Sequence, residues 1–273
     1  MVFYCLQLCY NWRMKRVLIF MLIVFLLLCL GCQNRLETGS TFDVLEPSAS
    51  ASGAAAQSGG RATTRTTASG TASVEVTATV AYVFEGKEGF TLYGAAEYQN
   101  TGSVPVTLSS ADFRFTVDGT AVHHTFTPML SEYDVVMPGE TSYAVLWLPV
   151  QNESTKPTLQ SSVTLAAELT CARTDSIRGA LDVDDLFLVQ NYPGFATLTG
   201  CVRNPAANEY SLNMIYAGFY DADGQLLGVW YLTKNALFEQ GDEKRFVTHL
   251  KELPIAGLAE NTAQFKTTAF AFM

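Results

Sequence analysis

The chain has 273 residues and a formal net charge of −9 at pH 7, with 26 acidic against 17 basic side chains. Three of the basic residues, Arg13, Lys15 and Arg16, lie close to the start, so 14 basic residues (17 − 3) face all 26 acidic ones in the rest of the chain. This acidic balance argues against a nucleic-acid partner and against electrostatic docking on anionic lipids.

The first feature along the chain is an apolar run between Met14 and Cys32. Lys15 and Arg16 stand before it, and the uncharged stretch 17–30 follows. A helix needs about 20 apolar residues to cross the bilayer core, so this stretch is short for a permanent span. A basic start followed by a short apolar run is typical of a secretory signal peptide, and Met14 is the expected true start.

The run ends in Leu30-Gly31-Cys32, which resembles a bacterial lipobox, although Cys29 stands where lipoboxes usually have Leu. The resemblance implies that residues 1–31 are removed and that Cys32 becomes a lipid-bearing N-terminus. The expected location is the extracytoplasmic face of the cell membrane, with the membrane itself as one partner. The alternative is an uncleaved membrane anchor, which exports the rest of the chain equally well.

Residues 32–73 are predicted to form the lipidated cysteine and a flexible linker. The part 48–73 consists almost entirely of Ser, Ala, Gly and Thr, which cannot bury enough apolar surface to offset the entropy of ordering. As a coil, the linker would span on the order of 35 Å root-mean-square. We therefore expect a tether that holds a folded body away from the membrane.

Alternating apolar and polar residues begin at Val74 and predict a series of half-buried strands. Short turn sequences rich in Gly, Asp and Pro separate them, and no convincing amphipathic helix is present. The expected fold is therefore all-β, of the β-sandwich type. In the first half, the predicted strands are 74–84, 90–99, 104–108, 113–117, 143–148 and 163–171.

The pattern then repeats after about 100 residues. Three pairs of short segments correspond at offsets of 104, 105 and 102 residues: 96–100 with 200–204, 118–119 with 223–224, and 138–140 with 240–242. This predicts two tandem sandwiches, 74–172 and 173–273. A single large sandwich built from both halves is the alternative.

The second repeat resembles the FxLYD-type immunoglobulin-like domains of bacterial surface lipoproteins. The likeness rests on Gly200-Cys-Val-Arg-Asn204, on Tyr216-Ala-Gly-Phe-Tyr-Asp221-Ala-Asp-Gly224 and on Gln240-Gly241-Asp242. The second motif has Ala217 in place of the leading Phe, and the third lacks its Pro. The resemblance implies tandem immunoglobulin-like sandwiches. Its motifs are turn and core residues, so it implies no enzymatic activity.

Few residues are candidates for chemistry. His123 and His124 are adjacent, and neighbours on a strand point to opposite faces, so they are not expected to share a metal. The acidic stretches 182–185 and 221–224 offer oxygen ligands but lack the Glu that closes an EF-hand loop, and 221–224 suits a hairpin turn better. We predict no catalytic, cofactor-binding or metal-binding residues, no cofactor and no enzyme activity, since no nucleophile motif is present.

Two cysteines and two aromatic residues leave open questions. Cys171 is predicted to be a buried small hydrophobe, and sequence alone does not decide whether it pairs with Cys201. Trp230 and Tyr231 are neighbours on a strand, so one of them must leave the core; burial against the other repeat is favoured over an exposed interface.

The function expected from these features is a non-catalytic binding or structural role at the cell envelope, with an envelope protein or a cell-wall polymer as partner. The alternative is a surface lipoprotein that binds a small ligand or a metal. A pocket lined by Trp230, Tyr231 and the region around Met129 would favour that alternative.

Overall fold

The computed structural model describes residues 41–43, 70–86, 89–128, 134–150, 157–176, 178–179, 181–192 and 195–272. The predicted signal peptide, the lipid site Cys32 and most of the linker lie outside these residues, as does Met129. Among the described residues, no helix is long and apolar enough to span a membrane.

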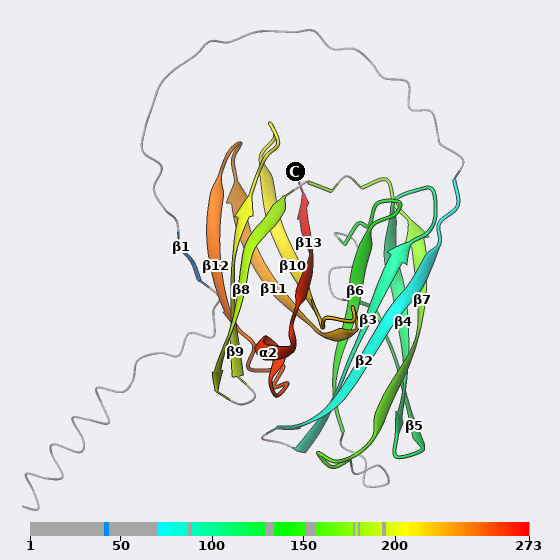
Figure 1. Ribbon diagram of the computed structural model, residues 1–273. Coiled ribbons are helices and arrows are strands. Elements are labelled where there is room, and N and C mark those ends of the chain that lie inside the picture. Colours follow the sequence, from blue (N-terminus) through cyan, green and yellow to red (C-terminus); the bar gives the residue numbers. More distant parts are fainter. Residues whose placement is uncertain are drawn as a thin grey trace, which may run out of the picture. The chain divides into compact units, whose positions relative to one another are not determined.

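Strands make up 67% of the structure and helix only 2%, which confirms the predicted all-β sandwich fold (Figure 1). The elements in order are β1 (Thr41–Asp43), β2 (Val74–Gly86), β3 (Gly89–Asn100), β4 (Val106–Val117), β5 (Thr120–Phe126), β6 (Thr141–Pro149), β7 (Val163–Arg173), β8 (Asp182–Tyr192), β9 (Phe195–Arg203), β10 (Tyr210–Tyr220), β11 (Leu226–Phe238), β12 (Glu243–His249), the helical turn α2 (Leu258–Asn261) and β13 (Gln264–Phe272).

One prediction of strands was wrong in detail. Residues 104–108 and 113–117 were expected to form two strands, and they belong to the single strand β4, which begins at Val106. The polar residues between them, such as Ser109 and Asp112, point away from the core. A register irregularity between Leu108 and Ser110 lets the strand continue past them, as a β-bulge does.

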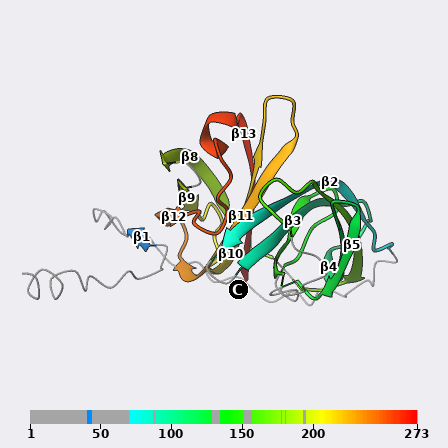
Figure 2. The same ribbon diagram turned by 90° about the horizontal axis from the view of Figure 1, so that it is seen from below.

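The strands form four antiparallel sheets with a repeated order. Sheet B has the order β2-β3-β6 and sheet C the order β5-β4-β7; sheet A has β8-β9-β12, with β1 added beyond β12, and sheet D has β11-β10-β13. Both repeats thus place their first, second and fifth strands in one sheet and the fourth, third and sixth in the other. Figures 1 and 2 show β2–β7 in one group and β8–β13 in another.

Close approach of the facing sheets explains a core glycine. A Cβ atom added at Gly94 on β3 would lie 2.7 Å from the Phe115 ring of β4, so only glycine leaves room for that ring. The turns that the sequence predicts at Asp118-Gly119, Gly139, Gly224 and Gly241 are confirmed, each with a glycine φ between 78° and 83°. Such positive φ values favour glycine because it lacks a Cβ atom.

The two repeats contact each other through sheets B and D. Strands β3 and β10 are buried along nearly their whole length on both faces, unlike β7 and β8, where burial alternates. Each therefore packs inside its own sandwich on one face and against the other repeat on the other face. Residues 40–273 form one compact unit, and the division at 172/173 into independently folding domains stays a prediction.

Tyrosine side chains of sheet B complete the edge of sheet D. The hydroxyl of Tyr93, fully buried, donates to the Val229 carbonyl at 2.8 Å and accepts from the Val229 N–H at 2.7 Å. The hydroxyl of Tyr82 donates to the Leu227 carbonyl at 2.9 Å. Val229 and Leu227 lie on β11, the edge strand of sheet D, so these bonds partner backbone groups that the sheet itself leaves open.

Candidate binding face

The outer face of sheet A is the candidate functional site. On β9, Leu198 and Val202 are buried, so Thr197 and Thr199 point outward by strand alternation. On β8, Phe187 is exposed and also points outward. We define the binding face by its outward side chains: Phe187, Val189, Asn191, Tyr192, Phe195, Thr197, Thr199, Val247 and His249.

Large apolar side chains on this face are exposed. Phe187 and Tyr192 expose 64% and 62% of their surface, and Val189 exposes 39%. Only six large hydrophobic residues are this exposed among those that the structure describes, and three of them are grouped here. Because exposed apolar groups that cluster mark interaction sites more often than scattered ones do, the grouping is informative.

The rings at one end of the face are ordered by stacking. Tyr192 and Phe195 stack with centroids 4.8 Å apart and planes at 15°, and Phe195 stacks on His249 at 5.7 Å and 25°. Thr197 connects the polar groups beside them: its hydroxyl donates to Asn191 Oδ1 at 2.6 Å and lies 3.0 Å from His249 Nδ1. This end of the face is therefore both aromatic and rich in hydrogen-bonding groups.

Charged residues bound the face at its other end. Arg203 contacts Asp184 at 2.5 Å, Glu243 at 2.9 Å and Asp185 at 3.4 Å. The Arg203 guanidinium lowers the pKa of Glu243, and a hydrogen bond with Cys201 lowers it further. The acidic stretch 182–185, a candidate for metal ligands, thus has two of its carboxylates paired with an arginine.

The two cysteines lie in different sheets and are both unpaired thiols. Cys171 on β7 is half-buried against the core, which is less burial than predicted. Cys201 on β9 is fully buried next to Glu243, and burial raises the pKa of its thiol to about 11. The structure thus answers the open question of a disulfide: there is none between them.

Trp230 and Tyr231 pack against the other repeat, the arrangement that the sequence favoured. Trp147 of β6 meets both rings edge-on, with centroids 6.1 Å from Trp230 and 5.5 Å from Tyr231. The Trp147 indole donates to the Glu252 carbonyl at 2.9 Å, and the Trp230 indole donates to the Thr248 hydroxyl at 3.1 Å. Trp147 thus lies against both rings, which the alternative hypothesis had placed in a ligand pocket.

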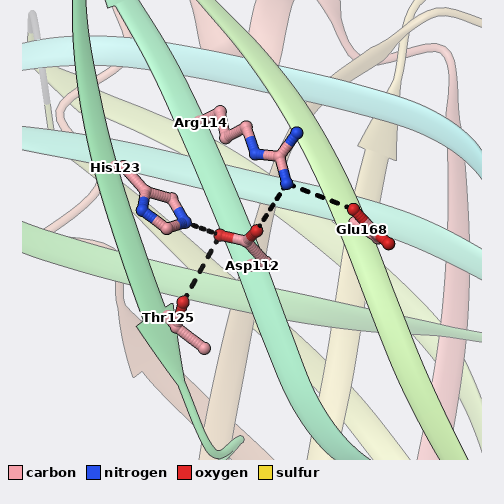
Figure 3. A network of polar contacts seen from close by, with 5 residues as sticks. All are labelled: Asp112, Arg114, His123, Thr125 and Glu168. Carbon is pink, nitrogen blue, oxygen red and sulfur yellow. Dashed lines mark hydrogen bonds and ion pairs between the residues drawn. The ribbon is translucent and has the colours of Figure 1, made fainter.

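The outer face of sheet C, in the first repeat, is polar. Figure 3 shows Asp112 bonded to His123 and Arg114, with Arg114 also 3.2 Å from Glu168. Partial burial would raise the pKa of Asp112, but hydrogen bonds from Arg114 and His123 outweigh it and lower the pKa. The Thr125 hydroxyl donates to Asp112 at 3.4 Å, which is longer than the contact of about 2.6–3.2 Å between an activated nucleophile and its base.

The histidines lie as strand alternation predicts. His123 bonds Asp112 on the outer face, whereas His124 stacks on Phe126, whose ring meets buried Phe113 on the inner side. The described residues contain no group of three or more His, Cys, Asp or Glu placed to hold a metal ion. In the stretch 221–224, the carboxylate of Asp221 accepts two backbone N–H groups, as in the predicted turn.

Two acidic residues are buried that the sequence did not single out. Glu97 on β3 is 6% exposed and joins the repeats: it accepts from Thr77 at 2.6 Å and from Tyr220, and it lies 3.1 Å from Lys266. By strand alternation, Glu97 has the position of an outward-pointing polar residue. Only its contacts with the second repeat reveal that it is buried.

Asp134 is the second buried acid. It is 3% exposed, and neither carboxylate oxygen has a hydrogen-bond partner within the described chain. The hydroxyls of Tyr98 and Ser142 are equally buried and equally unpartnered. Burial raises the pKa of Asp134 to about 8, although the positive charge of Arg178 acts in the opposite direction. Nothing in the spacing of Asp134 along the sequence predicted this environment.

Comparison with known proteins does not place the chain in a family: no protein-family model matches it, and no curated protein matches it.

Proposed function

We propose that the protein is a lipid-anchored, extracytoplasmic binding protein that recognises another envelope protein through the outer face of sheet A, without catalysis. The exposed aromatic residues on that face are the observation that carries the proposal, since most of the surface of Phe187 and of Tyr192 is open to solvent. Aromatic residues are enriched among the side chains that dominate protein–protein binding energy.

The layout of the face favours a protein over a cell-wall polymer. Its centre is apolar, with Phe187, Val189 and Val247, and its border holds the Arg203 cluster of ion pairs. An apolar centre with a polar rim is the usual composition of a protein interface. Arg245 also points outward on β12, near Glu243, so the two arginines of this face, Arg203 and Arg245, lie at its charged border and not among the exposed apolar side chains.

Site-specific photo-crosslinking in cells tests the proposal. A photoreactive residue at position 187 or 192 should capture one dominant protein. The matched control is the same group at Thr116 or Thr170, which are exposed on the outer face of sheet C. Equal capture from both faces, capture of wall polymer alone, or no capture would contradict the proposal.

The anchor has its own test. The chain should incorporate labelled palmitate, and Cys32→Ser should abolish the label, whereas Cys171→Ser should leave it unchanged. Continued labelling of Cys32→Ser would refute the lipid site without bearing on the binding face.

A further inference from the structure

Strand β1 breaks the symmetry of the two repeats. It pairs antiparallel with β12 and becomes the edge strand of sheet A. The counterpart of β12 in the first repeat is β6, which is the edge of sheet B within the described residues. The segment Thr41–Asp43 comes from the predicted linker, more than 30 residues before β2 (74 − 43), so the second repeat gains a strand from far upstream.

The register of β1 fits the residues that it meets. Phe42 lies opposite Phe246, which is 1% exposed in the core, and Asp43 lies opposite Arg245. Directly opposite residues of an antiparallel pair lie on the same face of the sheet. The register thus aligns an aromatic with an aromatic and an acid with a base.

The sequence singles out the same segment. Phe42 is the only aromatic residue between 33 and 69, and Val44 and Leu45 follow it before Pro47. Proline lacks a backbone N–H and so cannot continue a ladder. The part 48–73 consists almost entirely of Ser, Ala, Gly and Thr, and Leu36 is the only other large apolar residue between 33 and 69. An uncovered β12 would expose open backbone groups, which natural sheets tend to cover.

We propose that Thr41–Asp43 is a docking strand that fastens the linker to the second repeat. Nine peptide units (41 − 32) separate Cys32 from β1, whereas 42 (74 − 32) separate it from β2. As a coil, the shorter arm spans about 15–18 Å root-mean-square, against about 35 Å for the whole linker. The second repeat, and with it the binding face on sheet A, is then the part held near the membrane.

The membrane consequence rests on the proposed lipid anchor, and the docking itself does not. A binding face held near the membrane narrows the expected partner to a protein whose own binding site lies close to the bilayer, such as a membrane protein or another lipid-anchored protein. A freely extended linker would instead allow partners much farther out.

Cysteine crosslinking in the full chain tests the docking. Thr41→Cys with Val247→Cys places two thiols directly opposite, while Phe42→Cys with Val247→Cys shifts the register by one residue and sends them to opposite faces. The first pair should crosslink at least tenfold faster than the second. Equal rates, or no crosslink in either, would overturn the proposal. Repeating the experiment with Cys32→Ser should give the same result, which separates docking from lipidation.

Amide exchange gives a second measurement. Asp43→Pro should remove the strand pairing and speed exchange in β12, whereas Ala51→Pro, in the Ser/Ala/Gly part of the linker, should leave it unchanged. Unchanged exchange in Asp43→Pro would refute the docking.

Discussion

Asn100 and Asn204 fill the same place in the two repeats and make the same bonds. The side-chain amide of Asn100 donates to the carbonyls of Val104 and Val136, both at 2.9 Å. That of Asn204 donates to the carbonyls of Asn208 and Phe238, at 2.8 and 3.0 Å. Both residues are almost fully buried, at 0% and 1% exposure; Asn100 is the last residue of β3, and Asn204 directly follows β9. Each amide thus ties a strand end to two other parts of its sandwich.

Replacing either asparagine should therefore destabilise the fold by a similar amount. Asn100→Ala or Asn204→Ala leaves buried carbonyls without donors, and each buried unpartnered group costs about 1–3 kcal/mol. We expect a loss of at least about 2 kcal/mol in the free energy of unfolding for each variant, measured by denaturant titration. Asn191→Ala, on the exposed face, is the control and should change stability little; a comparable loss there would contradict the assignment.

Tyr93→Phe should weaken the contact between the repeats. It removes the one hydroxyl that serves both the N–H and the carbonyl of Val229, and leaves these groups buried. The expected loss is about 1–3 kcal/mol in the free energy of unfolding. Tyr192→Phe, which changes the same hydroxyl on an exposed ring, should have no measurable effect. An unchanged free energy of unfolding in Tyr93→Phe would contradict this, because the N–H and carbonyl of Val229 would then have other hydrogen-bond partners.

Asp134 should make stability fall as the pH rises. Its pKa is about 8 in the folded protein, whereas an unfolded Asp titrates near 4, so between these values the folded state binds more protons than the unfolded state. Stability then decreases from about pH 4 to about pH 8 and levels off above that range. Asp134→Asn should remove this contribution and flatten the pH dependence of the unfolding free energy. If the unfolding free energy of Asp134→Asn depended on pH as steeply as that of the wild type, the assignment of this pH dependence to Asp134 would be contradicted.

The two thiols should be present and slow to react. Burial raises the pKa of the Cys201 thiol to about 11 and also raises that of Cys171, so little thiolate exists at pH 8. Alkylation followed by mass spectrometry should label both cysteines fully in denaturant without reductant, and label Cys201 slowly in the folded protein. A need for reductant before labelling would reveal a disulfide that the structure does not contain.

The sandwich fold and most strands could be predicted because period-2 alternation and turn residues are local signals. Val74 to Phe84 and the Asp118-Gly119 turn illustrate both. The repeat was visible for the same reason, since turns recur at nearly constant offsets. The contact between sheets B and D was predicted only at Trp230 and Tyr231. The rest was not predictable, because a strand buried on both faces, such as β3, still carries polar residues like Glu97 whose partners lie far along the chain.

The binding face illustrates the same limit. Phe187 and Tyr192 are residue types that strands commonly contain, and only their exposure among the described residues shows that they lie on the outer face of sheet A. Strand β1 was missed because three residues are too few to show a period. Their pairing with β12 depends on a register that spans about 200 residues (246 − 42).

The most direct test of the account is quantitative capture of the partner from cells by the anchored protein and by Phe187→Ser/Tyr192→Ser, with Thr116→Ser as control. We expect the double variant to fold normally and to capture at least about tenfold less of the same protein, since aromatic anchors often contribute 2 kcal/mol or more to binding. The control should capture as much as the wild type. Undiminished capture by a folded double variant would contradict the claim that the outer face of sheet A is the recognition surface.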